Sequence, residues 1–321
     1  MKIFSLSFLL VLFFCACSTK KQPISSEDKV PFGDPFILLY DDTYYAYGTH
    51  SDDGIEVWVS KDLKEWTTPD DRETPCLALR KEDVWGGKWF WAPEVYHVNG
   101  KFYMYFSANE HICVATSDSP LGPFVQEEKK PMITGEKCID NSLFIDDDGK
   151  AYLFFDRFND GLNIWVAELE KDLITLKPET MHPCIHVSQP WEEVWPRVNE
   201  GSFVLKHNGL YYMTYSANSY ESPFYGIGCA TASDIMGEWT KYDHNPLLQK
   251  PGDLNGVGHS AFFKDKKGKL RIVFHAHNSQ TQIHPRHMYI GTASFKKQKN
   301  GPDILVIDST YMTPVLKKSR K

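Results

Sequence analysis

The sequence has no block of basic residues outside its last five positions, 317–321, which read KKSRK. Its formal net charge is -7, and its other Lys and Arg residues are spread along the chain. Nucleic-acid binding depends on clustered Lys and Arg side chains that neutralise phosphates. The composition therefore argues against nucleic acid as the main partner, and we interpret the basic tail as a solvated chain end.

Paired cysteines at metal-binding spacing are also missing. No CxxC pair and no Cys/His cluster occurs, which argues against a structural zinc site. We expect most of the cysteines after position 17 to be buried free thiols, although the sequence leaves any disulfide pairing open. These cysteines are Cys76, Cys113, Cys138, Cys184 and Cys229.

The longest apolar run, Ile3–Phe14, is too short to span a bilayer. It follows Lys2 and ends in Cys15-Ala16-Cys17, which resembles a bacterial lipoprotein signal in which Cys17 carries the lipid. A plain secretory signal is the alternative. The polar segment 18–30 is expected to be a flexible tether. The sequence thus predicts an exported bacterial lipoprotein on the periplasmic side or the cell surface, bound to membrane only through its lipid.

A long segment of helical period is absent too, and five similar segments occupy the chain instead. Each segment has an apolar strand, a turn and an aromatic-rich strand, and its first residue lies nine positions before the residue taken as the end of its turn. The intervals between segments are 57, 49, 60 and 59 residues. The first residues are Asp34, Trp91, Asp140, Glu200 and His259.

This period is typical of propeller blades with several short strands each. Further strand-like runs such as Ile55–Val59 and Ile112–Ala115 follow the hairpins, and 303–307 supplies a last strand. We therefore predict an all-β, five-bladed β-propeller with four antiparallel strands per blade. It forms a single domain over residues 31–316, and the sequence leaves the mode of ring closure and the oligomeric state open.

The first strand of each blade lines the channel of a propeller, so the five first residues are expected to meet around one axis. Three of them are carboxylic acids, which are costly to crowd together unless they are solvated, paired or functional. Close carboxyl groups push their pKa values apart, as acid/base catalysis of glycoside hydrolysis requires. The inverting reaction needs an acid and a base about 6.5–9.5 Å apart. A site for a hard cation is the main alternative.

The motifs at these positions resemble those of glycoside hydrolase family 43, the five-bladed propeller arabinofuranosidases, xylosidases and arabinanases. The resemblance covers nearly all of the chain after the tether, and the order and spacing of the motifs carry it. They are Asp34-Pro35, Trp91-Ala92-Pro93-Glu94, Ile139-Asp140, Glu200-Gly201-Ser202 and Gly258-His259-Ser260.

The resemblance implies catalytic roles for the three acids. Asp34 would be the general base that deprotonates water, and Glu200 would be the general acid. Asp140 would raise the pKa of Glu200 and orient it. Related retaining propellers carry Asn-Asp-Pro at the opening, whereas Gly33 precedes the aspartate here, which favours inversion.

Other residues are expected to hold the sugar or an ion. Trp91 is a candidate stacking wall, and Arg286 resembles a late arginine of the family that reaches the sugar. Glu94 and His277 are further candidates for substrate binding, with structural hydrogen bonding as the alternative for His277. The resemblance also implies a channel position for His259, near a calcium ion or a water cluster.

We therefore expect a carbohydrate-cleaving enzyme that removes terminal sugars, with α-L-arabinofuranosyl groups as the first choice. β-Xylosidase and β-galactofuranosidase activities remain open, because loop-borne pocket shape sets the specificity. The loops 182–199 and 278–287 are expected to form that pocket. A non-catalytic carbohydrate-binding propeller and a structural surface propeller are the readings outside the enzyme class.

Overall fold

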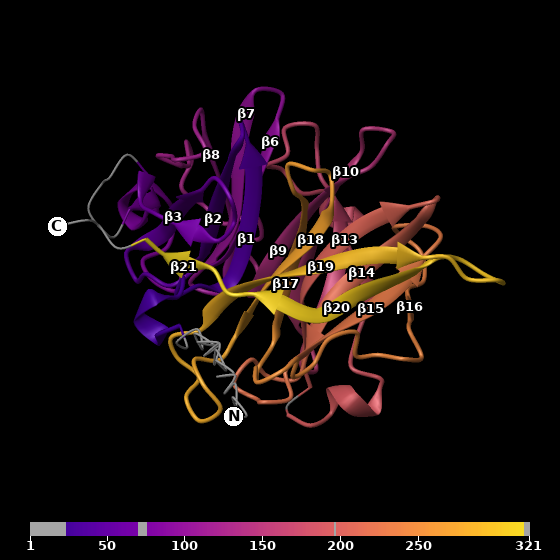
Figure 1. Ribbon diagram of the computed structural model, residues 1–321. Coiled ribbons are helices and arrows are strands. Elements are labelled where there is room, and N and C mark those ends of the chain that lie inside the picture. The colour runs from indigo at the N-terminus through magenta and orange to yellow at the C-terminus, as the bar shows by residue number, and fades with distance from the viewer. Residues whose placement is uncertain (1–23, 70–75, 196, 318–321) are drawn as a thin grey trace, which may run out of the picture.

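The computed structural model of the protein describes residues 24–69, 76–195 and 197–317 (Figure 1). The expected signal peptide, Cys17 and residues 318–321 of the basic tail lie outside these ranges. Among the residues described, no helix has the length and apolar character needed to cross a bilayer.

The described strands form five sheets that follow one another along the chain, together with one isolated strand pair (Figure 1). Neighbouring strands within each sheet are antiparallel. The first blade consists of β1 (Gly33–Tyr40), β2 (Thr43–Thr49), β3 (Gly54–Ser60) and β5 (Leu77–Arg80). The second consists of β6 (Trp91–Val98), β7 (Lys101–Ala108) and β8 (His111–Ser117). The third consists of β9 (Cys138–Ile145), β10 (Ala151–Phe158), β11 (Leu162–Glu168) and β12 (His182–Ile185).

The fourth blade consists of β13 (Asn199–His207), β14 (Leu210–Ala217), β15 (Gly226–Ala232) and β16 (Thr240–Lys241). The fifth consists of β17 (Gly258–Lys264), β18 (Leu270–Ala276), β19 (His287–Lys296) and β20 (Ile304–Met312). Short 3-10 helices lie before the first strand and between later ones: η1 (Ser26–Asp28), η3 (Lys81–Asp83), η4 (Pro178–Thr180) and η5 (Pro190–Glu192). The predicted five-bladed, all-β propeller is confirmed. In the second blade the fourth strand is reduced to a bridge between Thr116 and Val125.

The hairpins between the first two strands of the blades have two kinds of turn. Asn99-Gly100 and Asn208-Gly209 are two-residue turns in which both residues have positive φ, as a type I′ turn requires. Asp41-Asp42 forms a third turn of this kind. The third and fifth blades use longer connections, 146–150 and 265–269.

The ring closes without exchange of a strand between blades, because the strands of each blade follow in chain order. The chain end then returns to the first blade, where β21 (Val315–Leu316) pairs in parallel with β4 (Glu65–Trp66). In Figure 1 the yellow β20 and β21 lie on the path from the fifth blade to the indigo first blade. Lys29 forms a bridge with Val315, and Val30 is fully buried, so the end of the expected tether packs on the propeller.

The apolar core lies between neighbouring blades. One cluster joins the third and fourth blades and another joins the second and third, while the largest connects the fourth, fifth, first and second. Fully burying one large apolar side chain stabilises a fold by about 1.5–3 kcal/mol. The packed interfaces therefore hold the inner strand ends in fixed positions around the channel. Cys113, Cys138 and Cys229 are buried free thiols within these interfaces, as predicted.

Candidate active site

Each innermost strand contains a β-bulge near its start, where the pairing with the second strand shifts. One residue of each bulge adopts a positive φ. Such bulges re-aim side chains and are common beside active sites. The five residues are Asp34 (48°), Ala92 (46°), Asp140 (57°), Gly201 (57°) and His259 (47°).

The backbone N–H of each of these residues binds a side chain from the second strand of the preceding blade. We call these five contacts the interblade bonds. They tie each bulge to its neighbour and identify equivalent positions around the ring. The donors and their acceptors are Ala92 to Thr49 Oγ1 (2.9 Å), Asp140 to Ser107 Oγ (3.1 Å), Gly201 to Asp156 Oδ2 (3.0 Å), His259 to Ser216 Oγ (2.7 Å) and Asp34 to His275 Nδ1 (3.0 Å).

The predicted equivalence was wrong by one residue in two blades. Trp91 and Glu200 precede the positive-φ position, which Ala92 and Gly201 occupy. The prediction places each first residue a fixed nine positions before the end of its turn. That count failed because turns 146–150 and 265–269 are longer than the two-residue turns of the other blades. The bulge nevertheless lets adjacent residues face the same cavity, as Ile139 and Asp140 do. The acids therefore converge from two neighbouring positions per bulge.

A cavity of about 340 Å³ opens where the bulges meet, at the lower end of the usual range for small-molecule pockets. Six of the eight predicted site residues line this cavity. The other two, Glu94 and His277, do not. The loop 284–286 and Tyr220 complete its wall. The six residues are Asp34, Trp91, Asp140, Glu200, His259 and Arg286.

Asp34 is held as a carboxylate. Arg286 donates to it through both terminal nitrogens, with Nη1 2.7 Å from Oδ1 and Nη2 3.0 Å from Oδ2. Thr49 Oγ1 also donates to Oδ2 at 2.7 Å. Burial alone would raise the pKa of Asp34, but Arg286, with lesser contributions from His259 and His275, lowers it well below its usual range.

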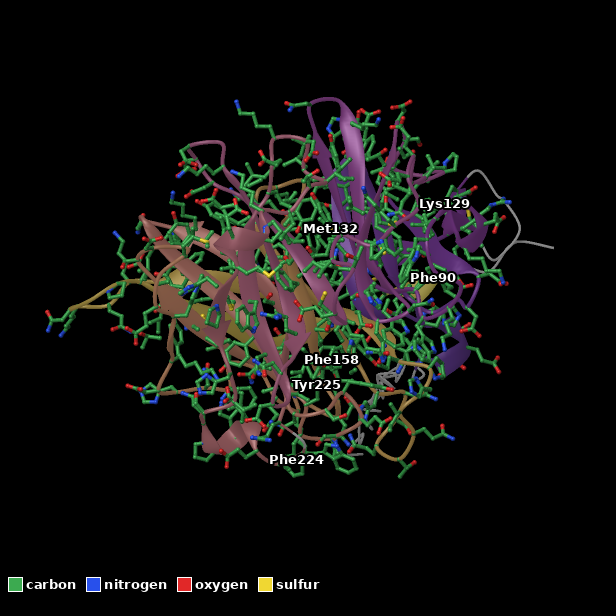
Figure 2. All side chains as sticks on the ribbon, turned by 180° about the vertical axis from the view of Figure 1, so that it is seen from behind. Phe90, Lys129, Met132, Phe158, Phe224 and Tyr225 are labelled. Atoms are coloured by element: carbon green, nitrogen blue, oxygen red, sulfur yellow. The ribbon has the colours of Figure 1, made fainter. Side chains whose placement is uncertain are left out.

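Glu200 occupies the opposite electrostatic environment in the same cavity. Burial raises the pKa of Glu200 to about 7, and the negative charge of Asp34 contributes in the same direction. Tyr225 donates its hydroxyl to Glu200 Oε1 at 2.7 Å. Figure 2 labels Tyr225 near the lower face, close to Phe224 on the same loop. Glu200 can therefore keep a proton near neutral pH.

Asp140 lies beside a carboxyl group that the sequence analysis missed. Burial and the neighbouring Glu200 and Asp34 raise the pKa of Asp140 well above its usual range, while a side-chain hydrogen bond with Asp156 lowers it. Asp156 is fully buried in β10. Its signal in the sequence is a charged residue directly after the apolar run Ala151–Phe155.

His259 lies near two of the acids, with Nδ1 3.4 Å from Asp34 Oδ1 and 3.7 Å from Asp140 Oδ2. Burial lowers the pKa of His259, so the imidazole is neutral at pH 7. Calcium prefers six to eight oxygen ligands. Here the Asp34 carboxylate is already bound by Arg286, and the described residues contain no group of three acidic, His or Cys side chains placed to hold a metal ion. The side chains beside His259 thus do not by themselves form a calcium site.

The remaining candidates have distinct places. Trp91 stacks on Trp89 with ring centroids 5.6 Å apart, which forms an aromatic wall beside the cavity. His277 contacts the carbonyl oxygen of Tyr220 at 2.7 Å and so supports a wall residue. Glu94 accepts a hydrogen bond from Tyr96, and burial raises the pKa of Glu94 to about 8.

Comparison with known proteins identifies the family. Residues 21–298 match the model of the glycosyl hydrolases family 43. The chain belongs to glycoside hydrolase family 43.

Three similar proteins align with most of the chain. A structure titled endo-1,4-β-xylanase, from Bacteroides thetaiotaomicron, is 45% identical with a TM-score of 0.84, over 90% of this chain and 98% of that one. A β-D-galactofuranosidase of Aspergillus niger is 26% identical over 76% of this chain and 73% of its own length. An arabinoxylan arabinofuranohydrolase of Bacillus subtilis is 29% identical over 76% of this chain and 55% of its own length.

Membership of family 43 makes the chain a glycosidase, as the sequence predicted, that acts on carbohydrate. The names of these relatives refer to different sugars. The family therefore fixes the reaction class and leaves the substrate to be proposed from the site.

Proposed function

We propose that the protein is an inverting glycosidase that removes terminal α-L-arabinofuranosyl groups, with Asp34 as general base and Glu200 as general acid. One observation carries the proposal. Two carboxyl groups of one cavity have pKa values displaced in opposite directions, that of Asp34 downward and that of Glu200 to about 7. Environments that separate two pKa values in this way assign one group as base and the other as acid.

The contacts of Asp34 suit a base that activates water. A carboxylate has about four lone-pair sites, and Arg286 and Thr49 together occupy three of them. One site thus remains for a water molecule. Arg286 fixes the carboxylate geometry and supplies further N–H groups for a sugar hydroxyl.

Glu200 suits an acid that protonates the leaving oxygen. Its proton is retained near neutral pH, and Tyr225 restricts the carboxyl group to one orientation. Asp140 belongs to the same group of interacting acids, since Glu200 contributes to the raised pKa of Asp140. In our proposal, an ionised Asp140 raises the pKa of Glu200 in return, because the interaction between two carboxyl groups is mutual.

The cavity and its rim support release of single sugars from a polymer. The cavity is small, and the loop with Arg286 and the ring of Tyr220 form its wall. All exposed Trp and Phe side chains in the described ranges belong to segments at the same end of the blades as the bulges. Aromatic faces at these positions suit contact with a glycan chain. They are Trp89, Phe158, Trp195 and Phe224, with exposed fractions of 39, 49, 56 and 41%.

The arabinofuranosyl specificity is supported by the relative from Bacillus subtilis. A β-xylosidase activity is the second candidate, because the Bacteroides thetaiotaomicron structure named for action on xylan is 45% identical. A β-galactofuranosidase activity follows from the name of the Aspergillus niger relative.

A panel of 4-nitrophenyl glycosides tests the proposal. It should contain α-L-arabinofuranoside, β-D-xylopyranoside and β-D-galactofuranoside, with Asp34→Asn and Glu200→Gln as matched variants. We expect the highest kcat/KM on the arabinofuranoside and a large loss in Asp34→Asn. Equal rates in wild type and both variants would refute the assigned roles, and binding of glycans without hydrolysis would indicate a carbohydrate-binding propeller.

We also propose export and lipid attachment at Cys17, supported by the signal-like sequence that ends there. Substitution Cys17→Ser should move the protein from the membrane fraction to the soluble fraction in a bacterial host. An unchanged membrane association would contradict lipidation at this residue. A calcium ion near His259 stays a prediction, which metal analysis of the purified protein tests.

A further inference from the structure

Asp156 departs from the pattern of the interblade bonds. In the other four blades the acceptor is a side chain that is neutral at pH 7: Thr49, Ser107, Ser216 or His275. In the third blade it is a carboxyl group with no exposed surface. A hydroxyl would suffice for the backbone contact, as two other blades show with serine. The carboxyl group at this position therefore requires another explanation.

The contacts of Asp156 connect two parts of the active site. Its Oδ2 accepts the N–H of Gly201 at 3.0 Å, directly after Glu200 in the chain. Its carboxyl group also forms a side-chain hydrogen bond with Asp140. The other oxygen, Oδ1, is buried and accepts from no N–H or O–H group of the described residues. Two carboxylates repel each other, so the contact with Asp140 is a hydrogen bond only if one of the two acids carries a proton.

The surroundings place that proton on Asp156. The titratable groups that face it are Asp140 of β9, Glu200 of β13 and the thiols of Cys138 and Cys184. Burial, and then the charges of Asp140 and Glu200, raise the pKa of Asp156 well above its usual range. Asp140 lies closer to positive charge, because the guanidinium group of Arg286 lowers the pKa of Asp140 and does not act on Asp156. Of the two acids, Asp140 is thus the better place for the negative charge.

We propose that Asp156 is a positioning residue that stays protonated, donates a hydrogen bond to Asp140 and holds the backbone beside Glu200. The proposal rests on the assigned roles of Glu200 and Asp140. The donated hydrogen bond stabilises Asp140 as an anion. An ionised Asp140 favours the protonated form of Glu200, which is the form that a general acid needs.

Two substitutions separate this role from the interblade bond. Asp156→Ser keeps an acceptor for Gly201 N–H, since serine serves in two other blades, but loses the contact with Asp140. Asp156→Asn keeps both contacts, with the amide nitrogen as donor to Asp140. The measurement is the pH profile of kcat/KM on the best 4-nitrophenyl glycoside, with thermal unfolding to verify that both variants fold.

We expect the alkaline limb of Asp156→Ser to move to lower pH, with activity at pH 7 reduced about tenfold or more. Asp156→Asn should recover most of that loss. A wild-type profile in Asp156→Ser would show that the residue only ties the blades together. Equal impairment in both variants would contradict the donor role.

Infrared difference spectroscopy provides a readout that needs neither activity nor the serine variant. The wild type minus Asp156→Asn spectrum at pH 7 should contain the C=O stretch of a protonated carboxyl group. Its absence would overturn the proposal. If the wild type hydrolyses no glycoside, the proposed function fails, while the infrared comparison still tests the proton on Asp156.

Discussion

The guanidinium group of Arg286 binds the carboxylate of Asp34 through two parallel hydrogen bonds of 2.7 and 3.0 Å. The two residues are 252 positions apart in the sequence, and only closure of the ring brings them together. The side chains of Arg286 and Asp34 are only 10% and 9% exposed, so the pair keeps Asp34 ionised and oriented rather than acting as a surface ion pair.

Substitution Arg286→Gln should shift the acid limb of the activity profile to higher pH. The pKa of Asp34 is depressed in the folded state, so its contribution to stability is present above about pH 4 and is lost as the pH falls through the folded pKa. Without Arg286 the buried carboxylate is uncompensated, and the free energy of unfolding at pH 7 should fall by about 3 kcal/mol. Arg286→Lys should restore the positive charge beside Asp34 but not the bidentate hydrogen bonding. Denaturant unfolding and pH–rate profiles check this, and an unmoved acid limb would contradict it.

Gly33 makes room for Arg286. A Cβ atom at this position would lie 2.3 Å from Cζ of the guanidinium group. Gly33→Ala should therefore displace Arg286 and reduce kcat/KM by about tenfold or more, as the hydrogen bonds to a charged group are lost. Gly87→Ala is the matched control, because no atom lies within 4 Å of its added Cβ. Equal kinetics of the two alanine variants would show that Arg286 tolerates the displacement.

Glu200→Gln should lose the most activity on substrates whose leaving group must be protonated as it departs. General acid catalysis contributes about 10²–10⁴-fold, so hydrolysis of natural glycosides should fall by that factor. Substrates with dinitrophenolate as the leaving group need little protonation and should lose much less. The wild type should show an alkaline limb near pH 7, which the variant lacks. A uniform loss on all leaving groups would argue against the acid role.

The raised pKa of Glu94 should make the stability of the fold depend on pH, independently of catalysis. Its pKa is about 8 when folded, against 4.5 as the ordinary value, so its contribution to stability is complete below pH 4.5 and is lost as the pH rises through 8. Glu94→Gln should leave stability at pH 6 nearly unchanged and make the protein more stable than wild type at pH 9.5 by a few kcal/mol at most. Chemical unfolding at the two pH values checks this. A loss of stability at both pH values would show that glutamine cannot replace Glu94 in its hydrogen bonds with Tyr96 and Ser142.

The sequence predicted the ring and the three acids because both depend on local patterns. A turn followed by an aromatic-rich strand recurs in each unit, and the acids stand near the start of the innermost strands. The register within each bulge was not predictable from spacing, because the lengths of turns 146–150 and 265–269 are set by their backbone geometry.

Contacts between distant segments were also beyond the sequence. Asp156 follows the apolar run Ala151–Phe155 within β10, and only the packing of the third blade on the fourth shows that it reaches Gly201. Glu94 stands in a motif beside Trp91, yet the strand directs it to Tyr96 rather than to the cavity. Side-chain direction after a bulge depends on the backbone dihedrals, which neighbouring blades fix through the interblade bonds.

The anomeric configuration of the first-formed sugar is the most direct test of the division between Asp34 and Glu200. Proton NMR of wild-type hydrolysis of an α-L-arabinofuranoside, recorded before mutarotation, distinguishes the two stereochemical outcomes. A base that activates water and a separate acid predict that the β-anomer appears first. Appearance of the α-anomer first would mean that a carboxylate attacks the sugar directly, and would contradict the role assigned to Asp34.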